Sequence, residues 1–299
     1  MPPTRAGALA PPVFLPRACL PDTMNLFDEL KIDCHNHVFD PRRFPYSPTT
    51  PYRPSQQEIG TAAQFTRVLD ACGVRHALLV GPTSGYRTDN RCMLDAIAHG
   101  GGRFKGVAVV ENDIAPGALL ALRDAGVVGV AFNPALEGLG VFDDAGALFA
   151  MLADHGLFAQ IQVAGDQLPH LLPLIEATRA RVLIDHCGRP DVAHGVGQPA
   201  FQALLRLAET GRVTVKLSGM QKFSQLSHPY QDAHAYLFAL LDAFGPEQCV
   251  WGSDWPFLRA PERMDYAPLL ALFGELVPDA AVRRRILWDT PRRLFGFGE

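Results

Sequence analysis

Near the start of the chain, residues 31–37 read KIDCHNH, and this segment gives the strongest indication of the fold. A short apolar run here ends in His35-Asn36-His37, whereas the first strand of a dinucleotide-binding, doubly wound sheet is followed by a glycine-rich turn. His35 and His37 are two residues apart, so both imidazoles project from the same side of an extended segment. Two imidazoles placed this way suit a metal ion or a developing oxyanion, and they predict a catalytic strand end.

Segments typical of strands and helices alternate along the rest of the chain. The strand-like segments are mostly aliphatic runs without polar alternation, as expected for strands buried on both faces. We predict strands over residues 31–35, 75–81, 104–111, 127–133, 157–163, 181–186, 212–218 and 248–254. We predict helices over residues 61–72, 90–99, 115–125, 143–155, 166–178, 198–210, 231–244, 263–276 and 279–294. Eight such units without a hairpin signal favour an α/β fold, a closed (β/α)8 TIM barrel.

The length and the cysteines bear on domain organisation and location. A chain of 299 residues fits one barrel of about 250 residues plus an extension. We expect residues 1–30 to form an irregular N-terminal extension, since they are proline-rich and make no convincing signal peptide, and residues 31–299 to form a single barrel. The six cysteines lie far apart and suit core positions in a reducing compartment. These features predict a cytoplasmic protein.

Charge and hydropathy narrow the class of partner. The net charge of −4 provides no basic field for phosphates, so nucleic-acid binding is not expected. No apolar run reaches the roughly 18–20 residues of a membrane span. The expected partner is therefore a small molecule, and a homo-oligomer is left open.

Three further motifs lie at the ends of predicted strands: IDHCGRP at 184–190, KLS at 216–218 and WGSDWP at 251–256. The carboxyl ends of barrel strands meet on one face, so His186 and Asp254 should join the histidine pair there. A carboxylate beside histidines can take a proton from water, which predicts Asp254 as the catalytic base. Arg189 can clamp a substrate carboxylate.

Four further side chains are candidates for binding substrate. Lys216 and Lys222, placed after the seventh strand, add cations. Tyr52 belongs to the irregular stretch 40–57, which we expect to form a lid or wall over the catalytic face. Ser84 follows the second strand.

These motifs, in this order, resemble the amidohydrolase superfamily, in the group of 2-pyrone-4,6-dicarboxylate lactonase and its relatives that open sugar and muconolactone rings. The resemblance runs from about residue 31 to the end, through DCHNHVF at 33–39, IDHCGRPD at 184–191 and WGSDWP at 251–256. It implies lactone hydrolysis, with water activated by Asp254. It also implies that His35, His37 and His186 polarise the lactone carbonyl.

The resemblance also bears on a metal. Much of the superfamily uses a divalent metal, whereas the pyrone-dicarboxylate lactonase works without one. The strand-four lysine and the strand-five histidine of two-metal members are absent here. The expectation is therefore no required cofactor, or a single zinc or manganese ion held by His35, His37, His186 and Asp254.

This chain differs from the group at several positions that would bind the substrate. Ala131 and the cation-free stretch 134–139 stand where the dicarboxylate lactonase has arginines, Gln162 or a neighbour replaces a tyrosine, and Lys222 replaces an arginine. Losing paired charges of roughly 1.5–3 kcal/mol each disfavours a dicarboxylate. We expect a less charged lactone, from a sugar acid or aromatic breakdown. The alternatives are an aromatic-acid decarboxylase using metal, an aldarolactone isomerase and a non-catalytic binding barrel.

Overall fold

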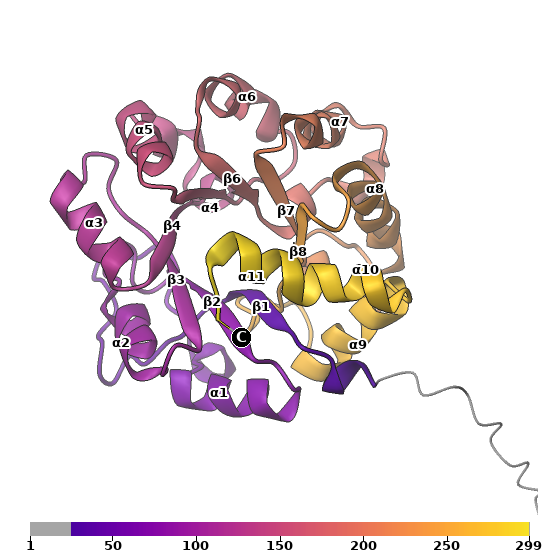
Figure 1. The fold of residues 1–299 in the computed structure, drawn as a ribbon, viewed down its shortest axis with the longest axis horizontal. Coiled ribbons are helices and arrows are strands. Elements are labelled where there is room, and N and C mark those ends of the chain that lie inside the picture. Colours follow the sequence, from indigo (N-terminus) through magenta and orange to yellow (C-terminus); the bar gives the residue numbers. More distant parts are fainter. Residues whose placement is uncertain (1–24, 299) are drawn as a thin grey trace, which may run out of the picture.

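The computed structural model describes residues 25–298, which form a barrel of eight parallel strands (Figure 1). The strands lie in sequence order, each paired with its neighbours. They are β1 (Ile32–Asn36), β2 (His76–Val80), β3 (Phe104–Ala108), β4 (Val127–Phe132), β5 (Phe158–Ile161), β6 (Arg181–Ile184), β7 (Val213–Leu217) and β8 (Cys249–Trp251). The chain beyond β8 returns to β1, where the Asp254 amide donates to the His35 carbonyl at 2.7 Å and the His37 amide donates to the Trp255 carbonyl at 2.8 Å. The predicted TIM barrel is confirmed.

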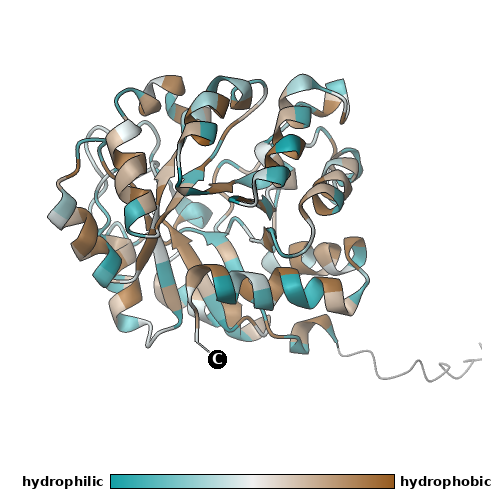
Figure 2. Cartoon of the chain, turned by 45° about the horizontal axis from the view of Figure 1, so that its top comes forward, coloured by the Kyte–Doolittle hydropathy of each residue, from teal (hydrophilic) through white to brown (hydrophobic). Residues whose placement is uncertain are grey.

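Helices surround the strands, and in Figure 2 the strands are mostly brown while the helices mix teal and brown. They are α1 (Ala62–Ala71), α2 (Arg91–His99), α3 (Pro116–Asp124), α4 (Pro134–Glu137), α5 (Gly146–Asp154), α6 (Leu168–Ala177), α7 (Pro199–Arg206), α8 (His234–Phe244), α9 (Tyr266–Leu276), α10 (Ala280–Arg284) and α11 (Thr290–Phe295). The sequence did not predict α4, because one turn is too short to show periodicity. Its signals are local: Asn133 caps the Leu136 amide at 3.2 Å, and Pro134 starts the turn.

Apolar side chains pack in two layers. One cluster fills the space between the strands and the outer helices. A second, inside the barrel, joins Ile32, Leu78, Val107 and Leu183 with Trp288 and the aromatic rings of α11 and the residues after it. The C-terminal helices cross the barrel in Figure 1. Trp288, Phe295 and Phe297 of this segment belong to the interior cluster. Polar side chains inside the barrel therefore collect toward the carboxyl ends of the strands.

The chain before β1 contacts the barrel from residue 25 onward. Leu26–Asp28 forms a 3-10 turn, and the buried Lys31 ammonium donates to the backbone carbonyls of Leu26, Phe27 and Glu29. Glu29 also pairs with Arg283 of α10. Most of the predicted extension, residues 1–24, lies outside the described residues. Within residues 25–298, no helix has the length and apolar character that crossing a membrane requires.

Candidate active site

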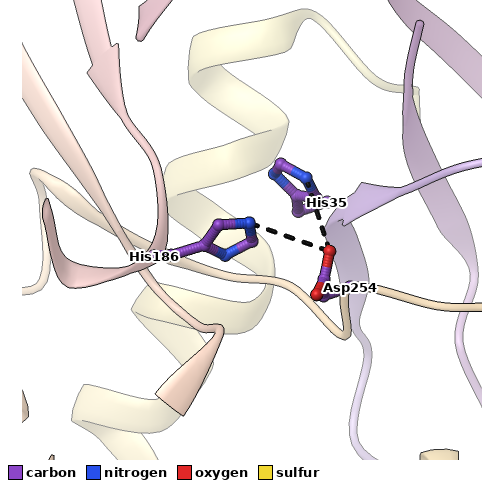
Figure 3. A group of neighbouring side chains, drawn as sticks. All are labelled: His35, His186 and Asp254. Carbon is purple, nitrogen blue, oxygen red and sulfur yellow. Dashed lines mark ion pairs between the residues drawn. The ribbon is translucent and has the colours of Figure 1, made fainter. Parts of the chain in front are cut away.

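Three of the four motifs line a cavity of about 390 Å³ at the carboxyl end of the barrel, through His37, His186, Arg189 and Asp254. His35 lies behind this lining, beside Asp254. The Nε2 atoms of the three predicted histidines lie 3.7–3.8 Å from Asp254 Oδ1, and Figure 3 shows two of them, His35 and His186, both directed at this oxygen. All four side chains are buried. The tertiary structure thus brings together residues up to 219 positions apart in the sequence, as the motifs predicted.

The surroundings of Asp254 keep it ionised. Gln221 donates to Asp254 Oδ2 at 3.0 Å, and the Lys222 ammonium lies 3.1 Å from the same oxygen. Burial by itself raises the pKa of Asp254, but attraction by Lys222 and the histidines outweighs it, so the pKa lies below its ordinary value. The backbone of Asp254 is left-handed, with φ of 63°, a conformation that non-glycine residues rarely adopt outside functional sites and turns. An ionised Asp254 can accept a proton from water.

Hydrogen-bond partners indicate where each histidine carries its proton. Burial lowers the pKa of His35, His37 and His186, so each is neutral near pH 7 with one N–H. His37 Nδ1 lies 2.9 Å from the Val80 carbonyl oxygen, which only accepts, so Nδ1 carries the proton and Nε2 presents a lone pair. His186 Nδ1 lies 3.1 Å from the Ser218 hydroxyl, which can donate or accept. A neutral His37 therefore accepts hydrogen bonds at the reacting centre.

Lys216 is not where the sequence placed it. It lies inside β7 rather than after it, it is fully buried, and it does not line the cavity. Its ammonium contacts Gln160 Oε1 at 2.7 Å, Asp185 Oδ1 at 3.0 Å and His35 Nδ1 at 3.0 Å. Gln160 and Asp185 were not predicted as site residues. The sequence held one signal for them: each is a polar residue near the end of an apolar run that predicts a strand.

The other predicted binding residues divide into two groups. Arg189, Lys222 and Ser84 line the cavity. Arg189 Nε is buried and has no hydrogen-bond partner among residues 25–298, and burial lowers the pKa of the guanidinium, which nevertheless stays cationic in proteins. An unpaired guanidinium at a cavity wall suits a carboxylate of the ligand.

Tyr52 does not line the cavity, and neither does any other residue of the stretch 40–57. Its hydroxyl donates to Glu58, and its ring lies under the guanidinium of Arg259, 4.3 Å from the ring centroid. Arg259 is a lining residue that the sequence did not suggest. Tyr52 therefore contacts the site only through its neighbour.

The site has the ligands for one metal ion. Ligand atoms of His35, His186 and Asp254 all lie within 4.8 Å of one another, and His35 Nε2 is buried with no hydrogen-bond partner in the described part of the chain. Two imidazole nitrogens and a carboxylate oxygen suit zinc or manganese. His37 is outside this group.

A family profile for amidohydrolases matches residues 32–297. The chain belongs to the amidohydrolase family. It is 34% identical over 276 residues to a 4-sulfomuconolactone hydrolase of Rhizobium radiobacter, which covers 88% of this chain and 89% of the relative. It is 26% identical over 234 residues to a D-galactarolactone isomerase of Agrobacterium fabrum, covering 77% and 80% of the two chains. A crystal structure of a probable 2-pyrone-4,6-dicarboxylic acid hydrolase from Acinetobacter baumannii, with citric acid bound, superposes on this amidohydrolase with a TM-score of 0.81. The two sequences are 29% identical, and the match covers 89% of this chain and 99% of that chain.

Gly252 gives a test of how closely the site is packed. A Cβ at residue 252 would lie 2.6 Å from both the Cβ and the amide nitrogen of His35. Gly252→Ala is therefore expected to lower the free energy of unfolding by about 1–3 kcal/mol through overpacking, and to lower activity by displacing His35. Gly117→Ala is the control, because a Cβ there meets nothing within 4 Å and alanine favours the helix by up to about 1 kcal/mol. Urea unfolding compares the two, and equal stability would contradict the packing argument.

Proposed function

We propose that this amidohydrolase hydrolyses the ring ester of a small lactone that carries one carboxylate. The observation that carries the proposal is the buried cluster in which the Nε2 atoms of His35, His37 and His186 lie 3.7–3.8 Å from Asp254 Oδ1. The relatives named as hydrolases of lactones support the reaction class. A small-molecule substrate fits a cavity of this size.

In the proposed reaction, water donates one hydrogen to Asp254 Oδ1 and the other to His37 Nε2, and its lone pair attacks the ring carbonyl. His35 and His186 stabilise the resulting oxyanion as hydrogen-bond donors. The ring C–O bond then breaks, and the proton taken up by Asp254 passes to the ring oxygen that leaves. His37 thus binds the water, whereas the family resemblance implied that it polarises the carbonyl. A divalent metal held by His35, His186 and Asp254 would supply Lewis-acid polarisation of the carbonyl.

The lining supports a substrate with a single anionic group. The lining includes the cations Arg189, Arg259 and Lys222 and the apolar residues Ala131, Phe132 and Leu136, and Lys222 is paired with Asp254. A second hollow of about 590 Å³ adjoins the cavity. Its lining includes Glu111, Asp113, Glu137, Asp143 and Asp144. A carboxylate would be repelled there, so the substrate carboxylate is placed on Arg189.

The rival reactions lack comparable support. A decarboxylase of the metal-dependent type needs a strand-five histidine, and β5 (Phe158–Ile161) contains no histidine. An isomerase is favoured only by the more distant galactarolactone relative. A cytoplasmic location is part of the proposal and accords with the five described cysteines, all free and buried.

The proposal is tested with chelator-treated protein and a panel of sugar-acid, muconic and pyrone lactones, following acid release with a pH indicator, with and without added zinc or manganese. Opening of a lactone by the metal-free protein is the expected result. Product analysis distinguishes a ring-opened hydroxy acid from an isomeric lactone, which would support the isomerase. Failure of every lactone in both arms would overturn the proposal.

The pH profile should extend to unusually low pH. Asp254 and His37 act deprotonated, and both have a pKa below the ordinary values of 3.8 and 6.5. A lowered pKa keeps each group deprotonated to lower pH, so kcat/KM should stay level down to pH 6.5 and fall only below it. An acid limb centred above pH 6.5 would contradict these assignments.

A further inference from the structure

A buried polar layer lies between the apolar barrel interior and the cavity, and none of the proposed chemical steps uses it directly. Lys216 is its centre, with Gln160 and Asp185 beside it and His35 above. We infer that Lys216 is a positioning residue that holds the proton of His35 on Nε2, making that nitrogen a hydrogen-bond donor and a poor metal ligand. The part that this proton plays in catalysis rests on the proposed function.

Three polar atoms surround the Lys216 side-chain nitrogen. Burial lowers the pKa of Lys216, but the negative charge of Asp185 opposes this and favours the ammonium form, which has three N–H donors and no lone pair. Its three neighbours are Gln160 Oε1 at 2.7 Å, Asp185 Oδ1 at 3.0 Å and His35 Nδ1 at 3.0 Å. Gln160 directs its Oε1 at Lys216 because its Nε2 donates to Asp185 Oδ2 at 2.9 Å. A donor at 3.0 Å requires a lone pair on His35 Nδ1, and a neutral imidazole with that lone pair carries its proton on Nε2.

Asp185 is the competing partner of the same nitrogen. Its Oδ1 lies 3.3 Å from His35 Nδ1 and would accept a proton placed there. The contact between His35 Nδ1 and Asp185 Oδ1 does not have hydrogen-bond geometry, however, whereas the contact from Lys216 to His35 has it. A proton on Nδ1 would also point an N–H at the ammonium. The layer therefore favours the Nε2–H form.

The two histidines of the His-Asn-His motif then have opposite roles. His37 Nε2 presents a lone pair, because its Nδ1 donates to Val80. His35 Nε2 presents a hydrogen, and this buried nitrogen has no partner within the described residues. A carbonyl oxygen of the substrate supplies the missing acceptor. A metal ion at His35 would require the proton to move to Nδ1, facing Lys216, so Lys216 weakens metal binding.

The proton position can be measured directly by NMR of protein labelled with nitrogen-15 in histidine, with His35 assigned by comparison with His35→Asn. The expected spectrum shows His35 as the Nε2–H tautomer in the metal-free wild type. This measurement involves no substrate, so its failure is distinct from failure of the lactonase proposal. An Nδ1–H tautomer in the wild type would overturn the inference.

The role of Lys216 is tested in the double variant Lys216→Met/Asp185→Asn, which removes one charge of each sign and leaves no unpaired buried ion. His35 Nδ1 can then donate to residue 185, and zinc affinity, measured by competition with a chromophoric chelator, should rise about 10- to 100-fold. Lys222→Met is the control, since Lys222 contacts Asp254 and not His35, so it should leave the His35 tautomer unchanged. An Nε2–H tautomer retained in the double variant, or unchanged zinc affinity, would contradict the inference.

Discussion

Replacing Asp254 with asparagine is expected to lower kcat by about 10³–10⁴-fold while the protein stays folded, because the amide cannot take a proton from water. Asparagine has nearly the same shape, and its oxygen can still accept the hydrogen bond that Gln221 donates to residue 254 at 3.0 Å. Initial rates at saturating lactone measure the loss. Circular dichroism and the melting temperature show whether the fold is intact.

The control for this variant is Asp191→Asn. Asp191 lies on the loop after β6, is exposed, and caps the Ala193 amide at 3.0 Å, which asparagine can also do. It does not line the cavity, so kcat should not change. If Asp254→Asn retained kcat within about tenfold of the wild type, Asp254 would not be the base.

Replacing Arg189 with glutamine is expected to lower kcat/KM for a carboxylated lactone by roughly 10²–10³-fold, mostly through KM. A charge-assisted hydrogen bond is worth about 1.5–3 kcal/mol, and a guanidinium can make two to one carboxylate. Arg189 Nε is buried without a hydrogen-bond partner among the described residues, so at least this donor is available to the ligand.

Two comparisons separate recognition of the carboxylate from damage to the fold. Arg189→Lys keeps the charge and should recover part of the lost kcat/KM, while its backbone meets the same left-handed φ of 43° as glutamine. A lactone without a carboxylate should be opened equally well by the wild type and Arg189→Gln. Equal losses on both lactones would show that Arg189 does not bind the carboxylate.

The fold could be predicted because its signals are local. Each strand is a short aliphatic run, and eight runs alternating with helical segments admit few architectures. His35, His37, His186 and Asp254 could be predicted for a related reason: each lies at a strand end, and a parallel barrel brings its strand ends to one face. The sequence alone thus determined the barrel, the catalytic face and the four central side chains.

The remaining features depended on contacts between distant strands. Lys216 looked like a loop cation, but it points into the barrel, where Asp185 and Gln160 offset the cost of burying its charge. Tyr52 looked like a substrate contact, but it packs beneath Arg259. The proton positions of His35 and His37 likewise follow from partners 181 and 43 residues away. A histidine in a sequence shows that a proton can be exchanged, whereas only its neighbours in space decide which nitrogen holds it.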